Sequence, residues 1–414
     1  MSRRQVLGIQ PVGLFVAAML ALTGCSLVPV EENTFESALL PAISQDNVGS
    51  VLARVDEAMT AANTARDPAL LAVVAAGALL EIDSARYAVD TLSDPEDASP
   101  APPMSHTDPT AFIPRFADYP QWFVVAAATQ EGGPLRLEVL ARESAAATWL
   151  VSIAPELLPE VEFPVLALDE AGYVVPLGPA DLGDLPVDAQ TLAEQHAAAL
   201  RGEAPLDSEP TDEPTDEPTD EPTDEPSPTS TESGPSATPA GFVSAVATPR
   251  AATTAATETP ADTSAPATPP STDTPGAAST PDAAAVAAMG AGLAADPWST
   301  ARRDADAAAS TAVGAAASVT STYDVQGVVD QALRTEDGGA LVFYALGGTR
   351  TYAVTPTYYL QLDATTAAIV GKPEVTAELT EQWAAQLAVY IPPDADGAPR
   401  VVGGRWDRVG LSGS

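Results

Sequence analysis

The apolar residues that follow position 42 first recur at helical spacing. One face of a helix collects Val48, Val51, Leu52, Val55 and Met59. Asp67-Pro68 predicts the start of a second helix, because Asp accepts hydrogen bonds from free N–H groups and Pro fits the first turn. The first folded region is therefore predicted to open with two helices.

After Asp83 the spacing changes, and apolar residues alternate with polar ones as they do in β-strands. The predicted strands are 86–92, 122–128, 135–139 and 148–153, with a hairpin of 165–168 and 173–177 around a turn at 169–172. Short turns between successive strands favour antiparallel pairing. We therefore expect two helices followed by a curved antiparallel sheet.

A second region repeats this order. A helix is predicted over 186–200, and Asp296-Pro297 begins another helix that runs to about residue 309. Predicted strands follow at 323–335, 340–346, 352–363, 380–391 and 400–411, with a tight turn at 336–339. Helices followed by about five antiparallel strands thus occur twice in the chain.

Between the two helices of the second region the sequence loses its apolar pattern. Four Thr-Asp-Glu-Pro units run from Thr211 to Pro226, and Ser, Thr, Pro and Ala dominate to about residue 282. Proline at every fourth position prevents helix formation, and the repeated carboxylates repel one another. We predict a disordered, acidic, low-complexity insert over 203–282, whose Ser and Thr content also allows O-glycosylation.

The element order predicts an α+β fold. Helices packed on the concave side of a bent antiparallel sheet are typical of cystatin-like and nuclear-transport-factor-like cone domains. We predict two such domains in tandem, at 43–180 and 181–414, with the second interrupted by the insert.

The amino terminus is predicted to be a lipoprotein signal peptide over 1–24. Arg3 and Arg4 precede an apolar run of about 11 residues, which spans roughly 16 Å as a helix and is too short for a bilayer core of about 30 Å. Leu22, Thr23, Gly24 and Cys25 then form a sequence that resembles the lipobox of bacterial lipoproteins.

This resemblance implies cleavage before Cys25 and lipid attachment to that cysteine. We expect residues 25–42 to tether the protein to the outer face of the cytoplasmic membrane. Arg3-Arg4 also resembles a twin-arginine export signal, so the export route stays open.

Charge and cysteine content narrow the range of partners. The chain carries 57 acidic and 18 basic residues, for a net charge of -39. Nucleic acids are excluded as partners, because Lys and Arg must neutralise their phosphates. The chain holds 1 cysteine, so no intramolecular disulfide can form and stability must come from packing.

Several segments in both regions resemble an uncharacterised family of actinobacterial lipoproteins that carry a domain of unknown function. These segments are 77–81, 113–115, 119–123, 149–151, 154–159 and 332–344. The resemblance implies a surface lipoprotein and assigns no functional residue. Residues 119–123 are interpreted as the start of a strand with a buried aromatic side chain, and residues 337–339 as part of a tight turn.

Groups capable of catalysis are sparse. His196 lies on the buried side of an Ala-rich helix and His106 in a loop, and neither has a neighbour at metal-ligand spacing. Glu81, Asp83 and Asp90 could point into a cone as acid-base groups, although solvated or capping roles are more typical of such residues. No cofactor or metal site is predicted, and Gly403-Gly404 is interpreted as a kink in the last strand.

The favoured function is a non-catalytic binding or scaffold module of the cell envelope. Its expected partners are the membrane, through the lipid on Cys25, and a small apolar ligand or an envelope protein. A cone-fold enzyme of the isomerase or dehydratase kind and a structural surface spacer stay as alternatives. The second region's concave side distinguishes these functions. An open, apolar concave side would indicate ligand binding, one lined by acid-base groups would indicate catalysis, and a filled one would indicate a structural role.

Overall fold

The structure is a computed structural model of the 414-residue chain. It describes residues 38–92, 103–130, 132–158, 161–203, 246–249, 293–294, 296–394 and 397–414. The predicted signal peptide, the lipobox with Cys25 and nearly all of the predicted insert lie outside these residues. Leu39–Ser414 forms one compact unit.

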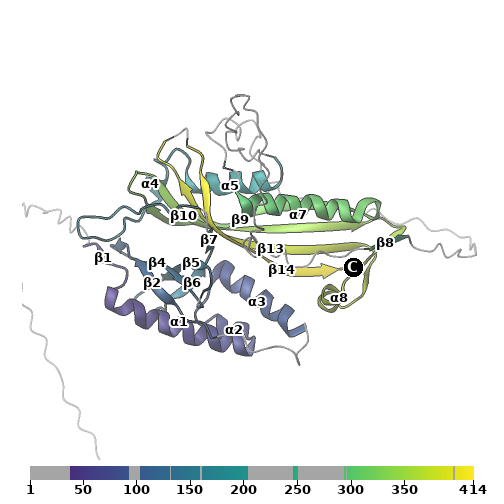
Figure 1. The fold of residues 1–414 in the computed structure, drawn as a ribbon, viewed down its shortest axis with the longest axis horizontal. Helices are drawn as coiled ribbons and strands as arrows, with labels where there is room; N and C mark the ends of the chain where they lie inside the picture. The colour runs from purple at the N-terminus through teal and green to yellow at the C-terminus, as the bar shows by residue number, and fades with distance from the viewer. Residues whose placement is uncertain are drawn as a thin grey trace, which may run out of the picture. The chain divides into compact units, whose positions relative to one another are not determined.

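The described residues of the first region form three helices and seven strands, most of which are labelled in Figure 1. They are β1 (Leu40–Pro41), α1 (Gln45–Ala65), α2 (Pro68–Leu71), α3 (Gly77–Leu92), β2 (Thr107–Phe112), β3 (Arg115–Phe116), β4 (Gln121–Ala128), β5 (Leu135–Arg142), β6 (Leu150–Ile153) and β7 (Glu156–Leu157). Both predicted helices are present, and Asp67 caps α2 by accepting a hydrogen bond from the Ala69 N–H. Leu40 and Pro41, predicted to be tether, instead pair with β3.

The prediction of a strand at 86–92 is wrong, because these residues end the helix α3. Its buried residues include Leu79, Ile82, Asp83 and Tyr87, which follow a helical period. Residues 86–92 taken alone alternate between polar and apolar side chains, and the helical spacing becomes visible only when the preceding residues of α3 are included.

The second region continues with shorter helices and long strands. Its elements are α4 (Pro179–Leu182), α5 (Ala189–Leu200), β8 (Val246–Pro249), α7 (Pro297–Val313), a 3₁₀ turn (Gly314–Ala316), β9 (Ala317–Arg334), β10 (Ala340–Val354), β11 (Tyr358–Gln361), α8 (Ala364–Val370), β12 (Glu374–Val375), β13 (Glu378–Ile391) and β14 (Arg400–Gly413). The predicted helices at 186–200 and from Asp296 are confirmed.

Three details of the second region differ from the prediction. Strand β10 runs on through Gly347-Gly348, where the absent side chains leave room for Gln326 and Tyr323 of the neighbouring strand. The helix α8 was missed, although Asp363 caps it. Residues 246–249, predicted to be disordered, form β8 and pair with β11.

One mostly antiparallel sheet of nine strands takes strands from both regions. Its order is β2-β4-β5-β7-β14-β13-β10-β9, with β6 paired to β5 outside this path. The α+β class is confirmed, whereas two separate cone domains are not, because the strands of both regions join in one sheet. The boundary at residue 180 stays a prediction.

The two regions meet where β7 pairs with β14. Gly403 and Gly404 lie opposite Leu157 and Glu156. A Cβ atom on Gly403 would lie 2.9 Å from the Glu156 carbonyl oxygen, so this close approach requires glycine. The predicted irregularity of the last strand is present as a shift of register between β13 and β14 beside Gly403.

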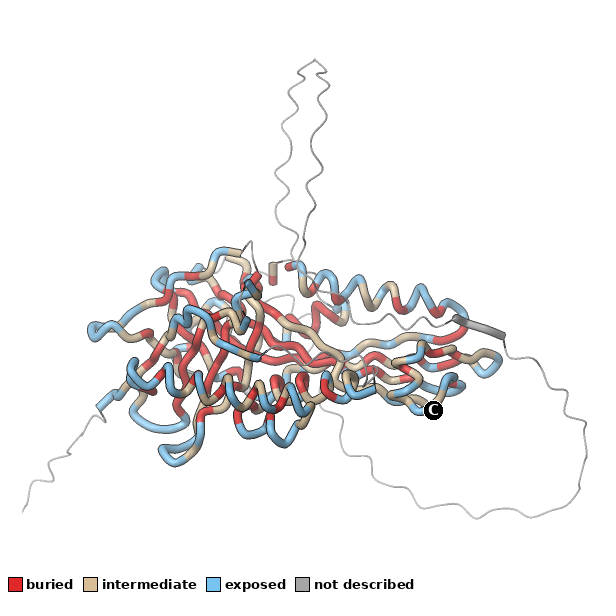
Figure 2. Tube along the Cα trace, turned by 60° about the horizontal axis from the view of Figure 1, so that its bottom comes forward, coloured by how far each residue is buried: buried red, intermediate tan, exposed pale blue. Residues whose placement is uncertain are grey.

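Buried positions concentrate along the strands and on the helix faces turned toward them (Figure 2). One apolar cluster joins α1, α2 and α3 to β4 and β5. A second joins the opposite face of β4 and β5 to β10 and β13, so it contains residues of both regions. A third packs α5 and α7 against β9, β10 and β13. The face of β9, β10 and β13 that α5 and α7 cover is therefore filled by apolar side chains.

Candidate functional site

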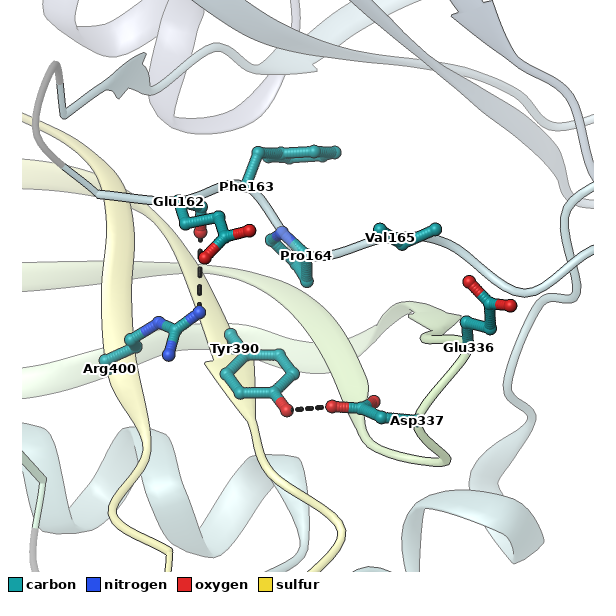
Figure 3. A pocket seen from close by; sticks show the side chains of 8 residues that line it. All are labelled: Glu162, Phe163, Pro164, Val165, Glu336, Asp337, Tyr390 and Arg400. Atoms are coloured by element: carbon teal, nitrogen blue, oxygen red, sulfur yellow. Dashed lines mark hydrogen bonds between the residues drawn. The ribbon is translucent and has the colours of Figure 1, made fainter.

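A surface cleft of about 440 Å³ lies where a loop of the first region meets the turn between β9 and β10 and the adjoining ends of β13 and β14 (Figure 3). It is lined by Glu162, Phe163, Pro164, Val165, Glu336, Asp337, Tyr390 and Arg400. Sequence reasoning identified the turn at 336–339 but assigned it no function. The other lining residues were missed, because segments far apart in the chain supply them.

Backbone hydrogen bonds hold the two walls of the cleft together. The Glu336 N–H donates to the Val165 carbonyl over 2.8 Å, and the Ala167 N–H donates to the Arg334 carbonyl over 2.9 Å. The turn is closed by the Thr335 N–H, which donates to the Gly339 carbonyl over 3.0 Å. The carboxylates of the turn thus have a fixed position relative to the loop opposite.

Asp337 is the most firmly held acid of the cleft. Its carboxylate accepts hydrogen bonds from the Thr335 hydroxyl at 2.5 Å, from the Gly339 N–H at 3.1 Å and from the Tyr390 hydroxyl. Although burial works to raise the pKa of Asp337, these donors lower it below its ordinary value. The side chain therefore stays charged near neutral pH.

Among the residues that the structure describes, Arg400 is the guanidinium group that lines the cleft. Its Cζ atom lies 4.6 Å from the centre of the Tyr390 ring, a distance typical of a cation–π contact. It also donates to the Glu162 carbonyl over a long 3.4 Å. Three carboxylates against one guanidinium leave the lining with an excess of negative charge.

His106 belongs to a second, buried cluster that the sequence did not reveal. Its Nδ1 lies 2.6 Å from Asp56 Oδ1, and its Nε2 lies 2.9 Å from Glu138 Oε2. The imidazole is 2% exposed and the Glu138 side chain 1%. Burial works to lower the pKa of His106, but the two carboxylates outweigh it and raise the pKa above its ordinary value.

His196 is also buried, but between neutral groups. Its Nδ1 lies 2.8 Å from the Tyr344 hydroxyl on β10, and its Nε2 lies 2.6 Å from the Ser299 hydroxyl on α7. Burial lowers the pKa of His196 to about 3. The predicted buried position is confirmed, and this contact joins the helices on either side of the predicted insert.

The carboxylates considered for catalysis do not converge on a cavity. Asp83 of α3 forms an ion pair with Arg405 of β14 at 2.9 Å and with Arg86 at 3.6 Å. Glu81 is exposed and Asp90 is partly exposed on the same helix. Asp83 therefore links the two regions through a partly buried charge pair.

A further ionic network fixes α7 to the sheet. Arg302 pairs with Asp306 at 2.7 Å, Asp306 also contacts Arg350, and Arg350 pairs with Glu381 at 3.2 Å. Every charge in this network is compensated, which is the condition for tolerating such groups in the interior. We assign it a structural role.

Within residues 38–414, apart from the gaps given above, no group of three or more His, Cys, Asp or Glu side chains is placed to hold a metal ion. No helix among these same residues is both long and apolar enough to cross a bilayer.

Comparison with known proteins gives matches of unassigned function. The model of a family described as a domain of unknown function (DUF8094) matches residues 39–242. An uncharacterized lipoprotein of Streptomyces coelicolor is 30% identical over 190 residues, which are 45% of this chain and 55% of that protein. An uncharacterized lipoprotein of Streptomyces avermitilis is 31% identical over 189 residues, or 46% of this chain and 55% of that protein.

The chain thus spans about half the length of the curated relatives it matches. No solved structure matches. The predicted resemblance to a family of actinobacterial lipoproteins with a domain of unknown function is confirmed.

Proposed function

We propose that this protein is a non-catalytic binding module of the cell envelope, anchored by lipid on Cys25 to the outer face of the cytoplasmic membrane. The observation that carries the anchoring is the sequence Leu22-Thr23-Gly24-Cys25 after a short apolar run. The names of the two relatives support it, because both are lipoproteins.

A binding role is supported by where the open space lies. The helix-covered face of the second region's strands is filled by apolar side chains, which suits neither a catalytic cavity nor a ligand pocket on that face and is the outcome expected of a structural role. The proposal of a binding role therefore depends on a different surface. Both ring nitrogens of each histidine are engaged by protein groups, so neither histidine presents a free nitrogen as a general base. The cleft in Figure 3, by contrast, opens to the surface between two regions of the chain.

We also propose that the two regions are cone-like halves whose sheets have joined. In each half, helices pack against one face of antiparallel strands. The halves share two residue pairs between β7 and β14, and the bridges Leu166–Thr335 and Pro176–Leu333 also join them. A scaffold of this kind holds the loop at 162–165 against the turn at 336–337, and the binding surface depends on both.

Replacement of the cysteine tests the anchoring directly. Cys25→Ala should move the protein from the membrane fraction to the medium or leave it with its signal peptide, and should abolish metabolic labelling with palmitate. Ser26→Ala is the matched control and should stay in the membrane fraction. Wild-type protein that takes up no palmitate, or a Cys25→Ala protein that stays processed and membrane-bound, would refute the proposal.

A further inference from the structure

We infer that the cleft binds an organic cation, a primary ammonium or guanidinium group carried on an aliphatic stem. This inference rests on the proposed binding function and names the chemistry of its ligand. The cation would come either from a small amine or from a basic side chain of an envelope protein. It differs from the small apolar ligand expected from the sequence, because the lining is not apolar.

The charged side chains that line the cleft carry a net negative charge. Among the described residues that line the cleft, Glu162, Glu336 and Asp337 bring three carboxylates against the guanidinium of Arg400. Within the part of the chain that the structure describes, the carboxylates of Glu162 and Glu336 have no ion-pair partner. An anion would meet net repulsion there, and an apolar ligand would strip water from carboxylates without compensating them.

The two walls of the cleft differ in chemical character. Phe163, Pro164 and Val165 follow one another in the loop. Val165 is 65% exposed, whereas Pro164 is buried and the Phe163 ring stacks on Phe112, so Val165 is the most exposed apolar side chain of this stretch. Figure 3 shows this stretch on one side of the cleft, with Glu336, Asp337 and the Tyr390 hydroxyl on the other. A ligand with an aliphatic stem and a charged head matches both walls, as lysine and arginine side chains do when they cover apolar surface.

The cleft already holds one cationic group, the guanidinium of Arg400. The guanidinium of Arg400 lies over the Tyr390 ring and donates a hydrogen bond to the Glu162 carbonyl over 3.4 Å. The electron-rich ring therefore attracts positive charge at this place. The Tyr390 hydroxyl meanwhile holds Asp337 in position beside it. A ligand cation would compete with Arg400 for this negative environment.

The competition with Arg400 gives the inference a distinctive test. Arg400→Gln should tighten the binding of a cation several-fold, because a like charge is removed. The double variant Glu162→Gln/Glu336→Gln should weaken binding about ten-fold, since each exposed ion pair contributes up to about a factor of five. Opposite effects from the two sides of one cleft are not expected from loss of structure.

The experiment uses the mature chain with Cys25→Ser, so that it stays in solution with its full length. Butylammonium, butanol and butyrate, which share a stem and differ in charge, are titrated while the amide resonances of Val165 and Asp337 are followed by NMR. Glu170→Gln is the matched control, because Glu170 is an exposed acid outside the cleft lining. It should change the dissociation constant by less than two-fold.

Saturable shifts with butylammonium, absent with butyrate and at least five-fold weaker with butanol, would support the inference. Equal binding of butanol and butylammonium would overturn it and leave the binding function standing. No binding of any probe would also overturn it, while membrane fractionation of the Cys25 variants still reports on the anchoring separately.

Amidated trilysine distinguishes the two sources of the cation. If it binds more than ten-fold tighter than butylammonium, the ligand is a basic segment of a protein. Comparable affinities identify a small amine. Either result supports an ammonium ligand, provided that the Glu162→Gln/Glu336→Gln variant binds the probe more weakly than the wild type.

Discussion

The two histidines of the chain are both buried, yet their surroundings have opposite character. His106 lies between the carboxylates of Asp56 and Glu138, so only a doubly protonated imidazolium can donate to both neighbours. His196 lies between two hydroxyl groups, which satisfy a neutral imidazole. The comparison shows that burial alone does not set the charge of a histidine.

The comparison also separates the two regions by how they respond to pH. The pKa of His106 is raised in the folded protein, so its stabilising contribution is complete below about pH 6.5 and is lost as pH rises through the raised value. The pKa of His196 is lowered, so its contribution is present above about pH 6.5 and is lost as pH falls. Together they favour a stability maximum near pH 6.5.

The largest expected effect comes from removing the charged histidine. His106→Ala removes the imidazolium beside the buried Glu138 carboxylate and leaves Arg136, 3.7 Å away, as its remaining counter-charge, so the substitution should cost about 3 kcal/mol of the free energy of unfolding. Urea denaturation at pH 6.5 measures it.

A second substitution shows whether the buried carboxylate of Glu138 causes this loss of stability. His106→Ala/Glu138→Gln removes the charge as well and should recover about 1 to 3 kcal/mol relative to His106→Ala. Arg136, which lies 3.7 Å from Glu138, keeps its carboxylate partner in His106→Ala and loses it in the double variant, which limits the recovery. If the double variant is as unstable as the single one, lost packing outweighs charge and the contrast between the histidines fails.

The second effect concerns acid sensitivity. Because the pKa of His196 is about 3 when folded and about 6.5 when unfolded, lowering the pH from 6.5 to 5 should cost about 2 kcal/mol through this residue. His196→Gln keeps a polar side chain that does not titrate, so its stability should fall less over this interval. Urea midpoints of both proteins at a series of pH values give the difference.

The decisive result is the difference between wild type and variant, since many carboxylates also titrate in this range. Parallel pH profiles for the two proteins would show that His196 is not the source of the acid sensitivity. The double variant at His106 and Glu138 should retain the loss of stability below pH 6.5, which confirms that the two clusters act independently.

These two clusters mark how far sequence reasoning reached. His196 was placed on a buried helix face because the apolar period of an Ala-rich helix was visible around it, and the structure agrees. The environment of His106 could not be predicted. Its partners lie 50 and 32 residues away, and Glu138 stands between apolar residues in a strand where alternation indicated an outward side chain.

The same limit applies to the fold and the cleft. Local signals such as the Asp-Pro helix starts and the glycine turn at 336–339 predicted most elements near their observed positions. The joining of β7 to β14 depends on a close approach at Gly403 to a strand some 245 residues earlier, which no local pattern records. The cleft depends on that long-range arrangement and was missed with it.

The smallest expected effect tests whether burial or hydrogen bonding keeps His196 neutral. Ser299→Ala removes the hydroxyl 2.6 Å from Nε2 and should cost about 1 kcal/mol of the free energy of unfolding. Ser310→Ala, at an exposed position of the same helix, is the control and should change stability by less than about 0.5 kcal/mol. Because burial is the cause of the low pKa, the imidazole carbon resonances of His196 in Ser299→Ala should still show no titration between pH 5 and 7. A titration appearing in that range would show that the hydroxyl, and not burial, distinguishes His196 from His106.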